Sequence, residues 1–387
     1  MKLPIDLKAV IEAATDIESA RNTPVSVSVL IDDSAPGDVA AHVRSAFVGA
    51  GAHARVTVGY FVGPAFSPYE GDDMAVIVAG FSEEVGRRAA EIRAAGVPVM
   101  VVTSMPRLVA DMASAYGNPI PEGDLVAPEG VEGCEADGDA ACESGDVAGA
   151  HASVFAGIRA AKSAGVGTAA GSSGAAASSP DVSDAPIPID AAAAAALDRR
   201  MGEWVVAACR EKRLALALSF PFVRRPLSLE AVSATSLQNA GIGLVLFIPG
   251  ADMPLMTLNQ AKMLLQIAAA YGEPMSAARA KELAAIVGGA FACRSVARQV
   301  AGAVSAIGWA VKAGVGYAGT KAMGLAAVEY FERGGNIAGL AGVVSAATAK
   351  ATQIAGDVAA TPAGARVFST VKTAVRQGAA SVLKKTE

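Results

Sequence analysis

Short apolar runs alternate with helix-like segments between residues 5 and 102, and this alternation constrains the fold more than any other feature of the chain. Strand-length runs separated by helices are typical of βαβ units and of a parallel sheet. We therefore predict a small Rossmann-like α/β domain over residues 1–120. Its expected strands are Val25–Ile31, Arg55–Phe61, Met74–Val78 and Val97–Val102, and its expected helices are residues 5–20, Val39–Val48 and Glu83–Ala95.

The loop after the first expected strand lacks the chemistry of a phosphate-binding loop. Such a loop needs glycines that let the backbone approach phosphate, a lysine for charge and a Ser or Thr for magnesium. Only Gly37 fits here, because Asp38 stands at the lysine position and Val39 at the Ser/Thr position. The guanine-reading Asn-Lys-x-Asp motif of GTPases is replaced by Thr-Ser-Met-Pro at residues 103–106. An acid in place of the lysine would repel a triphosphate, so we expect no nucleotide or other cofactor.

Asp32 and Asp33 follow the first expected strand, where the magnesium-binding acids of receiver domains lie. Those domains need a third aspartate at the end of a neighbouring strand, which here ends with Val-Ala-Gly at residues 78–80. We interpret the pair as solvated turn acids near a helix N-terminus.

Histidines and cysteines add no site. None of the three histidines (His42, His53 and His151) neighbours a plausible nucleophile, and the chain has no Cys-x-x-Cys pair. Cys134 and Cys142 lie with His151 in an acidic stretch whose composition explains them without a metal. We predict no catalytic residue, no metal ligand and no enzymatic activity.

The composition changes between residues 121 and 190. The first part is rich in Glu, Asp and Gly, and the part from Gly165 to Pro180 consists mainly of Gly, Ala and Ser. Neither part can bury enough apolar surface to offset the entropy of ordering. We predict a flexible linker over residues 121–190. Net charge follows the same division: −5 for residues 1–120, −10 for residues 121–197 and +10 for residues 198–387.

Apolar residues recur at helical spacing after residue 190, which predicts an all-α domain over residues 191–335 and an Ala-rich helical tail over residues 336–387. The chain is 52% hydrophobic and only 18% charged, against about 25% charged in a typical soluble protein. The excess apolar surface must be buried in a large core, in a partner or in lipid. The expected helices of the domain are Ala191–Leu216, Leu229–Ile248, Thr257–Ala270, Ser276–Val304 and Ile307–Arg333.

The segment from Phe247 to Gln260 holds three of the four candidate binding residues. Thr257 and Gln260 fit a Thr-x-x-Gln capping box, which is a purely structural role. The alternative is that polar groups at a break between apolar helices bind a ligand, as they often do in membrane proteins. The candidate residues for binding or structure are Asp252, Asn259, Gln260 and Lys312.

Apolar helices combined with a charge of +10 favour an anionic membrane surface. Ala231–Ala251 and Gln299–Thr320 are long enough to be considered as transmembrane helices, although the first begins with polar residues and the second contains Lys312. We expect peripheral attachment or a shallow helical hairpin on the cytoplasmic side of the cell membrane. The alternative is a cytoplasmic helical bundle that packs through small residues spaced four apart: Ala306, Ala310, Gly314, Ala318, Ala322 and Ala326.

Residues 215–333 resemble the YcjF-like domain of unknown function, which occurs with Era-type GTPase domains in bacteria. Six blocks carry the resemblance: PGADMP at 249–254, TLNQ at 257–260, IAAAYG at 267–272, VGGAF at 287–291, GWAVK at 308–312 and YAGT at 317–320. The resemblance implies membrane association and linkage to GTPase-like modules, and it implies no reaction. By the same comparison, the N-terminal domain is similar to a degenerate GTPase.

The sequence therefore predicts a non-enzymatic, membrane-associated regulatory or scaffolding protein. Two alternatives stay open: a GTPase-like nucleotide-binding protein with non-standard motifs, and a small transporter or channel component. The expected partners are anionic membrane lipid, a GTPase or another helical protein, and a second copy of the chain. Nucleic acid is not an expected partner.

Overall fold

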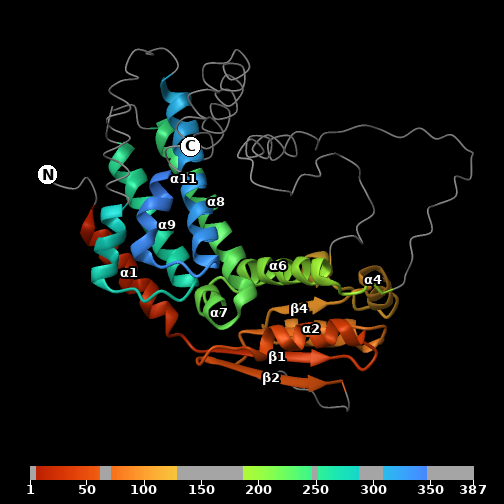
Figure 1. Ribbon diagram of the computed structural model, residues 1–387. Coiled ribbons are helices and arrows are strands. Elements are labelled where there is room, and N and C mark those ends of the chain that lie inside the picture. The colour runs from red at the N-terminus through yellow and green to blue at the C-terminus, as the bar shows by residue number, and fades with distance from the viewer. Residues whose placement is uncertain (1–5, 62–70, 129–185, 246–251, 287–307, 347–387) are drawn as a thin grey trace, which may run out of the picture. The chain divides into compact units, whose positions relative to one another are not determined.

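A five-stranded, wholly parallel sheet in the order β2-β1-β3-β4-β5 forms the first part of the structure, a computed structural model (Figure 1). The structure describes residues 6–61, 71–128, 186–245, 252–286 and 308–346. Strands β1, β3 and β4 are almost completely buried, as continuous apolar runs in a parallel sheet must be. The strands are β1 (Val25–Ile31), β2 (Ala54–Tyr60), β3 (Met74–Val78), β4 (Val99–Val102) and β5 (Leu125–Val126).

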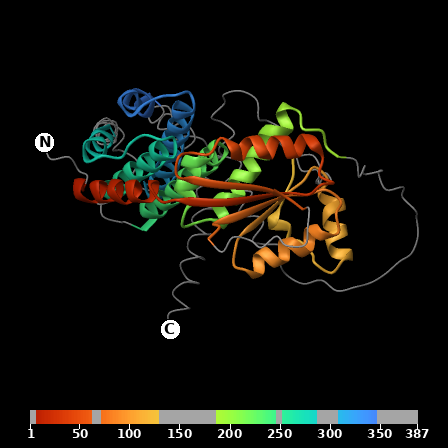
Figure 2. The ribbon, with the colours of Figure 1, turned by 90° about the horizontal axis from the view of Figure 1, so that it is seen from below.

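Helices cover both faces of the sheet (Figure 2). On one face, α2 and α6 share a core with the side chains of Val29, Val76 and Val102. On the other face, α3 and α4 pack against the alternate residues of the same strands, such as Ile77 and Val101. The helices are α2 (Gly37–Val48), α3 (Glu84–Ala94), α4 (Pro106–Ala115) and α6 (Ala191–Ala208). The predicted fold class, an α/β part followed by an all-α part, is confirmed.

Strand β5 lies inside the segment predicted as a linker, and α6 belongs to the α/β core. Met201 and Val205 of α6 are completely buried in the same core as β3 and β4. The sequence missed β5 because two residues are too few to show a periodic pattern. The α/β core thus continues past the predicted domain limits at residues 121 and 191. The rest of the predicted linker, residues 129–185 with Cys134, Cys142 and His151, lies outside the described residues.

The helix expected over residues 191–216 is two helices, α6 and α7 (Arg213–Ser219). The chain then turns at Phe220, which packs against Phe47 at the end of α2 with the ring centroids 4.9 Å apart. The backbone N–H of Gly51 also donates to the carbonyl of Ser219 (3.2 Å). These contacts join the sheet to the beginning of the helical part.

Long helices make up the second part of the structure. The first helix of the chain also belongs here, because Val10 and Ala14 are buried against the core around Leu264. Glu18 reinforces this placement by accepting a hydrogen bond from the N–H of Met275 (3.0 Å). The helices are α1 (Leu7–Arg21), α8 (Pro221–Val245), α9 (Asp252–Ala270) and α11 (Gly308–Glu332), and residues 277–286 and 340–346 are also helical.

Small residues allow α8 and α11 to approach closely. A Cβ atom added at Gly324 of α11 would lie 2.4 Å from Cγ2 of Val232 in α8. Of the predicted stripe, Ala318, Ala322 and Ala326 are only half-buried and lie beside this face, whereas Met323, Gly324 and Ala327 are buried. The other three members, Ala306, Ala310 and Gly314, lie outside the part of the chain whose burial the structure describes.

The prediction of transmembrane character is wrong for the part of the chain that the structure describes. There, no helix is both long enough and apolar enough to span a bilayer. The physical reason is that the apolar side chains of α8, α9 and α11 face one another in a core, and polar residues lie at buried positions among them. The expected attachment to anionic lipid is not tested by this observation and stays a prediction.

Candidate functional site

The carboxyl edge of the sheet between β1 and β3 is where a doubly wound fold binds ligands. From β1 the chain crosses through α2 to β2 on one side, whereas β3 pairs with β1 on the other side. Ligands of such folds bind in the crevice outside the strand ends at this topological switch point. In this protein the loops at the switch point begin at Asp32, after β1, and at Ala79, after β3.

The carboxylate of Asp32 ties these two loops together. It is 3% exposed. Its Oδ2 accepts hydrogen bonds from the N–H of Gly80 (2.9 Å), the hydroxyl of Ser34 (2.7 Å) and, more weakly, the N–H of Ser82 (3.4 Å). Its Oδ1 accepts from the N–H of Ser34 (3.2 Å). The predicted interpretation of Asp32 as a solvated turn acid is wrong, because the side chain is buried and linked to both loops.

The two loops are in direct contact where Ser34 meets residues 80 and 81. Oγ of Ser34 accepts a hydrogen bond from the N–H of Phe81 (3.0 Å). A Cβ atom added at Gly80 would lie 2.3 Å from the backbone carbonyl atoms of Ser34. Glycine at position 80 is therefore required by the close approach of the two loops.

The carboxylate of Asp32 accepts hydrogen bonds from backbone N–H groups of the kind that bind anions in nucleotide-binding folds. Backbone N–H groups at strand ends and helix N-termini are the donors that bind phosphate in nucleotide-binding folds. Here the N–H groups of Ser34, Gly80 and Ser82 point at Asp32 instead. A phosphate brought to this edge would have to displace those bonds and would face the charge of Asp32.

A second carboxylate stands at the N-terminus of α2, together with a strap formed by residues 186–190. Asp38 accepts from the N–H of Ile189 (3.0 Å), and the N–H of Ile187 donates to the carbonyl of Ser104 (3.2 Å). The strap therefore runs from the end of β4 to the first turn of α2. Asp38, predicted to repel phosphate, is used to hold the chain itself.

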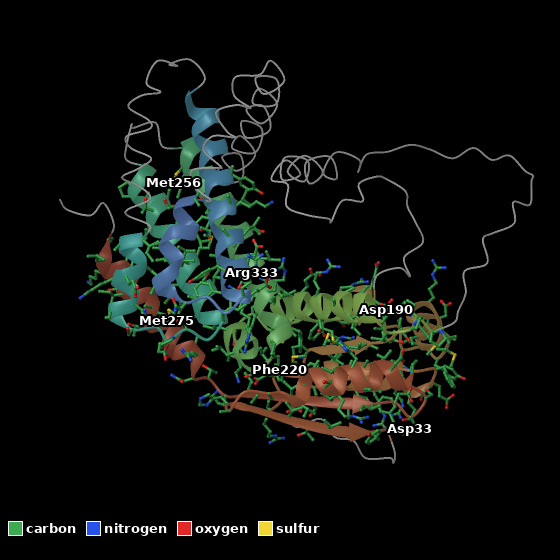
Figure 3. All side chains as sticks on the ribbon, in the orientation of Figure 1. Asp33, Asp190, Phe220, Met256, Met275 and Arg333 are labelled. Carbon is green, nitrogen blue, oxygen red and sulfur yellow. The ribbon has the colours of Figure 1, made fainter. Side chains whose placement is uncertain are left out.

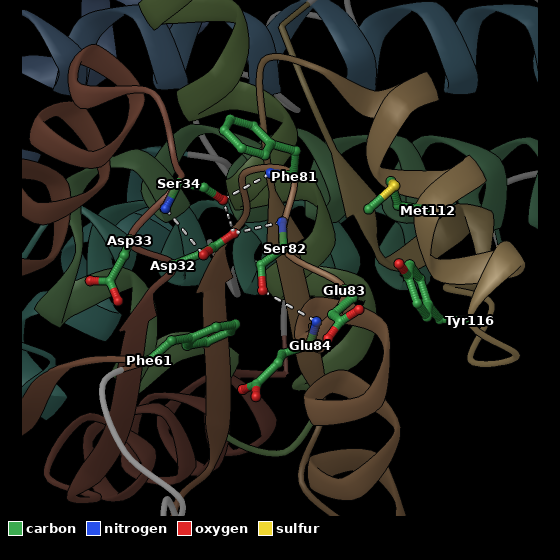
Figure 4. Close-up of a pocket in the computed structure, with 10 residues that line it drawn as sticks. All are labelled: Asp32, Asp33, Ser34, Phe61, Phe81, Ser82, Glu83, Glu84, Met112 and Tyr116. Carbon is green, nitrogen blue, oxygen red and sulfur yellow. Dashed lines mark hydrogen bonds between the residues drawn. The ribbon is translucent and has the colours of Figure 1, made fainter.

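A groove opens on the α3 and α4 side of this edge (Figure 4). We name it the edge groove. It has a volume of about 570 Å³ and is lined by residues 32–34, Phe61, residues 81–84, Met112 and Tyr116. Phe81 and Tyr116 stand at its rim with 58% and 52% of their surfaces exposed. Among the described residues, no lysine or arginine lines it, whereas four carboxylates do.

The four carboxylates differ in how far they are compensated. Asp32 is fully hydrogen-bonded, as described above. Arg88 holds Glu84 with an Nε–Oε2 distance of 3.0 Å, and together with Arg87 it lowers the pKa of that carboxyl. Glu83 raises the pKa of the Tyr116 phenol through a hydrogen bond and its charge. Glu83 and Asp33 are exposed and are the carboxylates that face solvent at the groove.

Two of the four predicted site residues come together in the helical part, in a polar cluster that is mostly buried. We name it the amide cluster: Asn239 of α8, Asn259 and Gln260 of α9, and Thr320 of α11. The hydroxyl oxygen of Thr320 accepts hydrogen bonds from the amides of Asn239 and Gln260, both at 2.9 Å. Asn259 donates to the amide oxygen of Asn239 (3.1 Å).

The amide cluster contacts itself rather than a cavity. Asn239 and Thr320 are completely buried, and Gln260 is 2% exposed. Asn239 also donates to the carbonyl of Met256 (3.4 Å), a residue labelled on α9 in Figure 3. Satisfied polar groups inside an apolar bundle fix one register of the helices, because any other register leaves them unpaired. The predicted capping box is wrong, because α9 begins at Asp252 and Thr257 and Gln260 lie inside the helix. Gln260 instead has a structural role between helices through its hydrogen bond to Thr320.

For the other two predicted residues, the structure gives only their positions in the helices. Asp252 is the first residue of α9 and Lys312 lies in the second turn of α11, and the side chains of both lie outside the described part. The sequence missed Asn239 and Thr320 as members of the site because each looks like an isolated polar residue in an apolar helix. Their helical spacing from buried neighbours was the available signal.

Among the residues that the structure describes, no group of three or more His, Cys, Asp or Glu side chains could hold a metal ion. A scan against protein-family models and searches of curated proteins and of solved structures found no match to this chain.

Proposed function

We propose that this protein is a non-enzymatic regulatory or scaffolding protein whose α/β part has the sheet of a nucleotide-binding fold but binds no nucleotide. The observation that supports this most strongly is the carboxylate of Asp32, which takes the N–H groups of Gly80 and Ser34 at the switch point. A buried anion in this position opposes a phosphate both by charge and by competition for donors.

The strap supports the same proposal. Asp38 and Ser104 both accept hydrogen bonds from the backbone of the strap. A phosphate that approached the N-terminus of α2 would therefore meet the carboxylate of Asp38 with the strap already bound to it. Binding of a phosphate at this edge would require the loss of at least the two hydrogen bonds of the strap, in addition to those of Asp32.

The helical part suits a scaffold. The amide cluster and the close contact of Gly324 with Val232 give α8, α9 and α11 a single arrangement. On the resemblance of residues 215–333 to the YcjF-like domain, we propose that the scaffold serves a GTPase-like or helical partner.

Titration calorimetry and a hydrolysis assay with GTP and ATP, each with Mg²⁺, test this proposal on the full chain. We expect no saturable heat up to millimolar nucleotide, a limit of about −4 kcal/mol, and no phosphate release above the buffer rate. A dissociation constant in the micromolar range, about −8 kcal/mol, would instead support the alternative of a nucleotide-binding protein with non-standard contacts.

A further inference from the structure

Two large aromatic side chains, Phe81 and Tyr116, are exposed at the rim of the edge groove. Exposed apolar groups gathered around a hollow mark interaction sites more often than isolated ones do. The backbone of Phe81 is held in place, because its N–H donates a hydrogen bond to the hydroxyl oxygen of Ser34. The side chain is therefore held out toward solvent by a fixed backbone.

The negative charge of the edge groove favours a positively charged ligand. Asp33 and Glu83 face solvent, and none of the described residues that line the groove is basic. Glu83 and Tyr116 both line the groove, and Glu83 is hydrogen-bonded to the Tyr116 phenol, so a cation bound there would meet a carboxylate and an aromatic side chain together. Aromatic faces attract lysine and arginine side chains, and carboxylates hydrogen-bond them.

The groove is open to solvent, and this shape favours a macromolecular ligand over a small cation. Pockets for small ligands bury most of the ligand surface, whereas here Asp33, Phe81, Glu83 and Tyr116 are all exposed. Aromatic anchors of this exposure are typical of protein interfaces.

We infer that the edge groove docks a lysine- or arginine-bearing segment of a partner protein, with Phe81 and Tyr116 as apolar contacts and Asp33 and Glu83 as the ion-pair partners. This inference rests on the proposed scaffolding function and names the chemistry of its partner. The groove lies on the α3 and α4 side of the edge, apart from the strap, so docking requires no opening of the sheet.

Fluorescence anisotropy on the full chain tests the inference. The probe is a labelled, capped peptide of alternating arginine, lysine and glycine, and a matched peptide has glutamate in place of the basic residues. We expect saturable binding of the basic peptide alone, weakened on the order of fivefold or more by Phe81→Ala and by Glu83→Gln. The matched controls Leu237→Ala, at a 69% exposed residue of α8, and Glu12→Gln, on α1, should leave binding unchanged.

Four outcomes would overturn the inference. The first is that the basic peptide does not bind, and the second is that Glu12→Gln weakens binding as much as Glu83→Gln does. The third is that spermidine displaces the labelled peptide as well as the unlabelled basic peptide does. The fourth is that a synthetic peptide of residues 366–387 binds more tightly than the basic peptide and loses affinity with the same groove substitutions. The last would assign the groove to the basic end of this chain itself. Each is separate from nucleotide binding, which alone decides whether the proposed function fails.

Discussion

Oδ2 of Asp32 lies 2.9 Å from the backbone nitrogen of Gly80, and this hydrogen bond joins the two loops that meet at the switch point of the sheet. In a ligand-binding sheet of this topology the same two loops diverge to form a crevice. Here the carboxylate of Asp32 accepts hydrogen bonds from both loops and holds them in contact.

Gly80→Ala should destabilise the protein strongly. The new Cβ would lie 2.3 Å from the backbone of Ser34, and neither loop can move without breaking the bonds of Asp32. We expect a loss of about 3 kcal/mol in the free energy of unfolding, measured by urea denaturation. Gly37→Ala is the control, because nothing lies within 4 Å of its added Cβ. Equal stability of the two variants would mean that the loops are not in close contact.

Thr320→Val should destabilise the helical part although it preserves side-chain shape. The substitution removes an oxygen that accepts from two buried amides, those of Asn239 and Gln260. We expect a cost of about 2–4 kcal/mol by chemical denaturation, because buried donors lose their partner. Thr320→Ser should recover most of it by restoring the hydroxyl. Thr15→Val, at an exposed hydroxyl of α1, should change stability little. If the valine variant matches the wild type, the amide cluster does not fix the helices.

Cys209 should be unreactive in the native protein and should make stability depend on alkaline pH. Burial, with a smaller contribution from the charge of Asp73, raises the pKa of this thiol to about 12. Its ionised form is thus disfavoured in the folded state. The contribution of this thiol to the free energy of unfolding is fully present below about pH 8.5, which is its approximate pKa in the unfolded chain. Above that pH the thiol ionises in the unfolded chain first, so this contribution is lost as pH rises toward the folded pKa.

The measurement for Cys209 is alkylation followed by peptide mapping at pH 8, with and without urea. We expect labelling of this cysteine only in urea. In addition, the stability of the wild type should fall between pH 8.5 and pH 10 by about 2 kcal/mol more than that of Cys209→Ala. Fast labelling in the folded protein would show that the thiol is accessible.

Residues 22–129 alone should not fold cooperatively. Without α6, the face of β3 and β4 that covers Met201, Val205 and Leu197 would be exposed to water. A chain of residues 22–227, which includes α6 and the Phe220 contact, should show a single cooperative transition by circular dichroism. A sigmoidal transition in the shorter chain would mean that α6 is not part of the α/β core.

The pattern of apolar residues predicted the parallel sheet, because β1, β3 and β4 are each recognisable from their own continuous apolar run. It could not predict which core a helix joins. Residues 5–20 and 191–208 were both expected to be helical, yet α1 packs on α9 and α6 packs on the sheet. That choice depends on contacts between residues far apart in the sequence.

The candidate site shows the same limit. Asn259 and Gln260 were singled out from a conspicuous segment, whereas Asn239 and Thr320 become partners only when three helices meet. At the sheet edge, the sequence showed that Asp38 and Val39 do not fit a phosphate loop. The bonds of Asp32 across the crevice required the positions of both loops.

Chemical rescue of Asp32→Ala tests most directly whether this carboxylate fills an anion position. The variant leaves the N–H groups of Gly80 and Ser34 without their acceptor, and we expect a loss of about 3 kcal/mol in stability. The measurement is the thermal midpoint of wild type and variant with increasing sodium formate, against sodium chloride as the ionic-strength control. We expect formate, a carboxylate of similar size, to raise the midpoint of the variant and to leave that of the wild type nearly unchanged. Equal responses of the two proteins to formate, or a variant as stable as the wild type, would show that the Asp32 carboxylate does not fill an anion position.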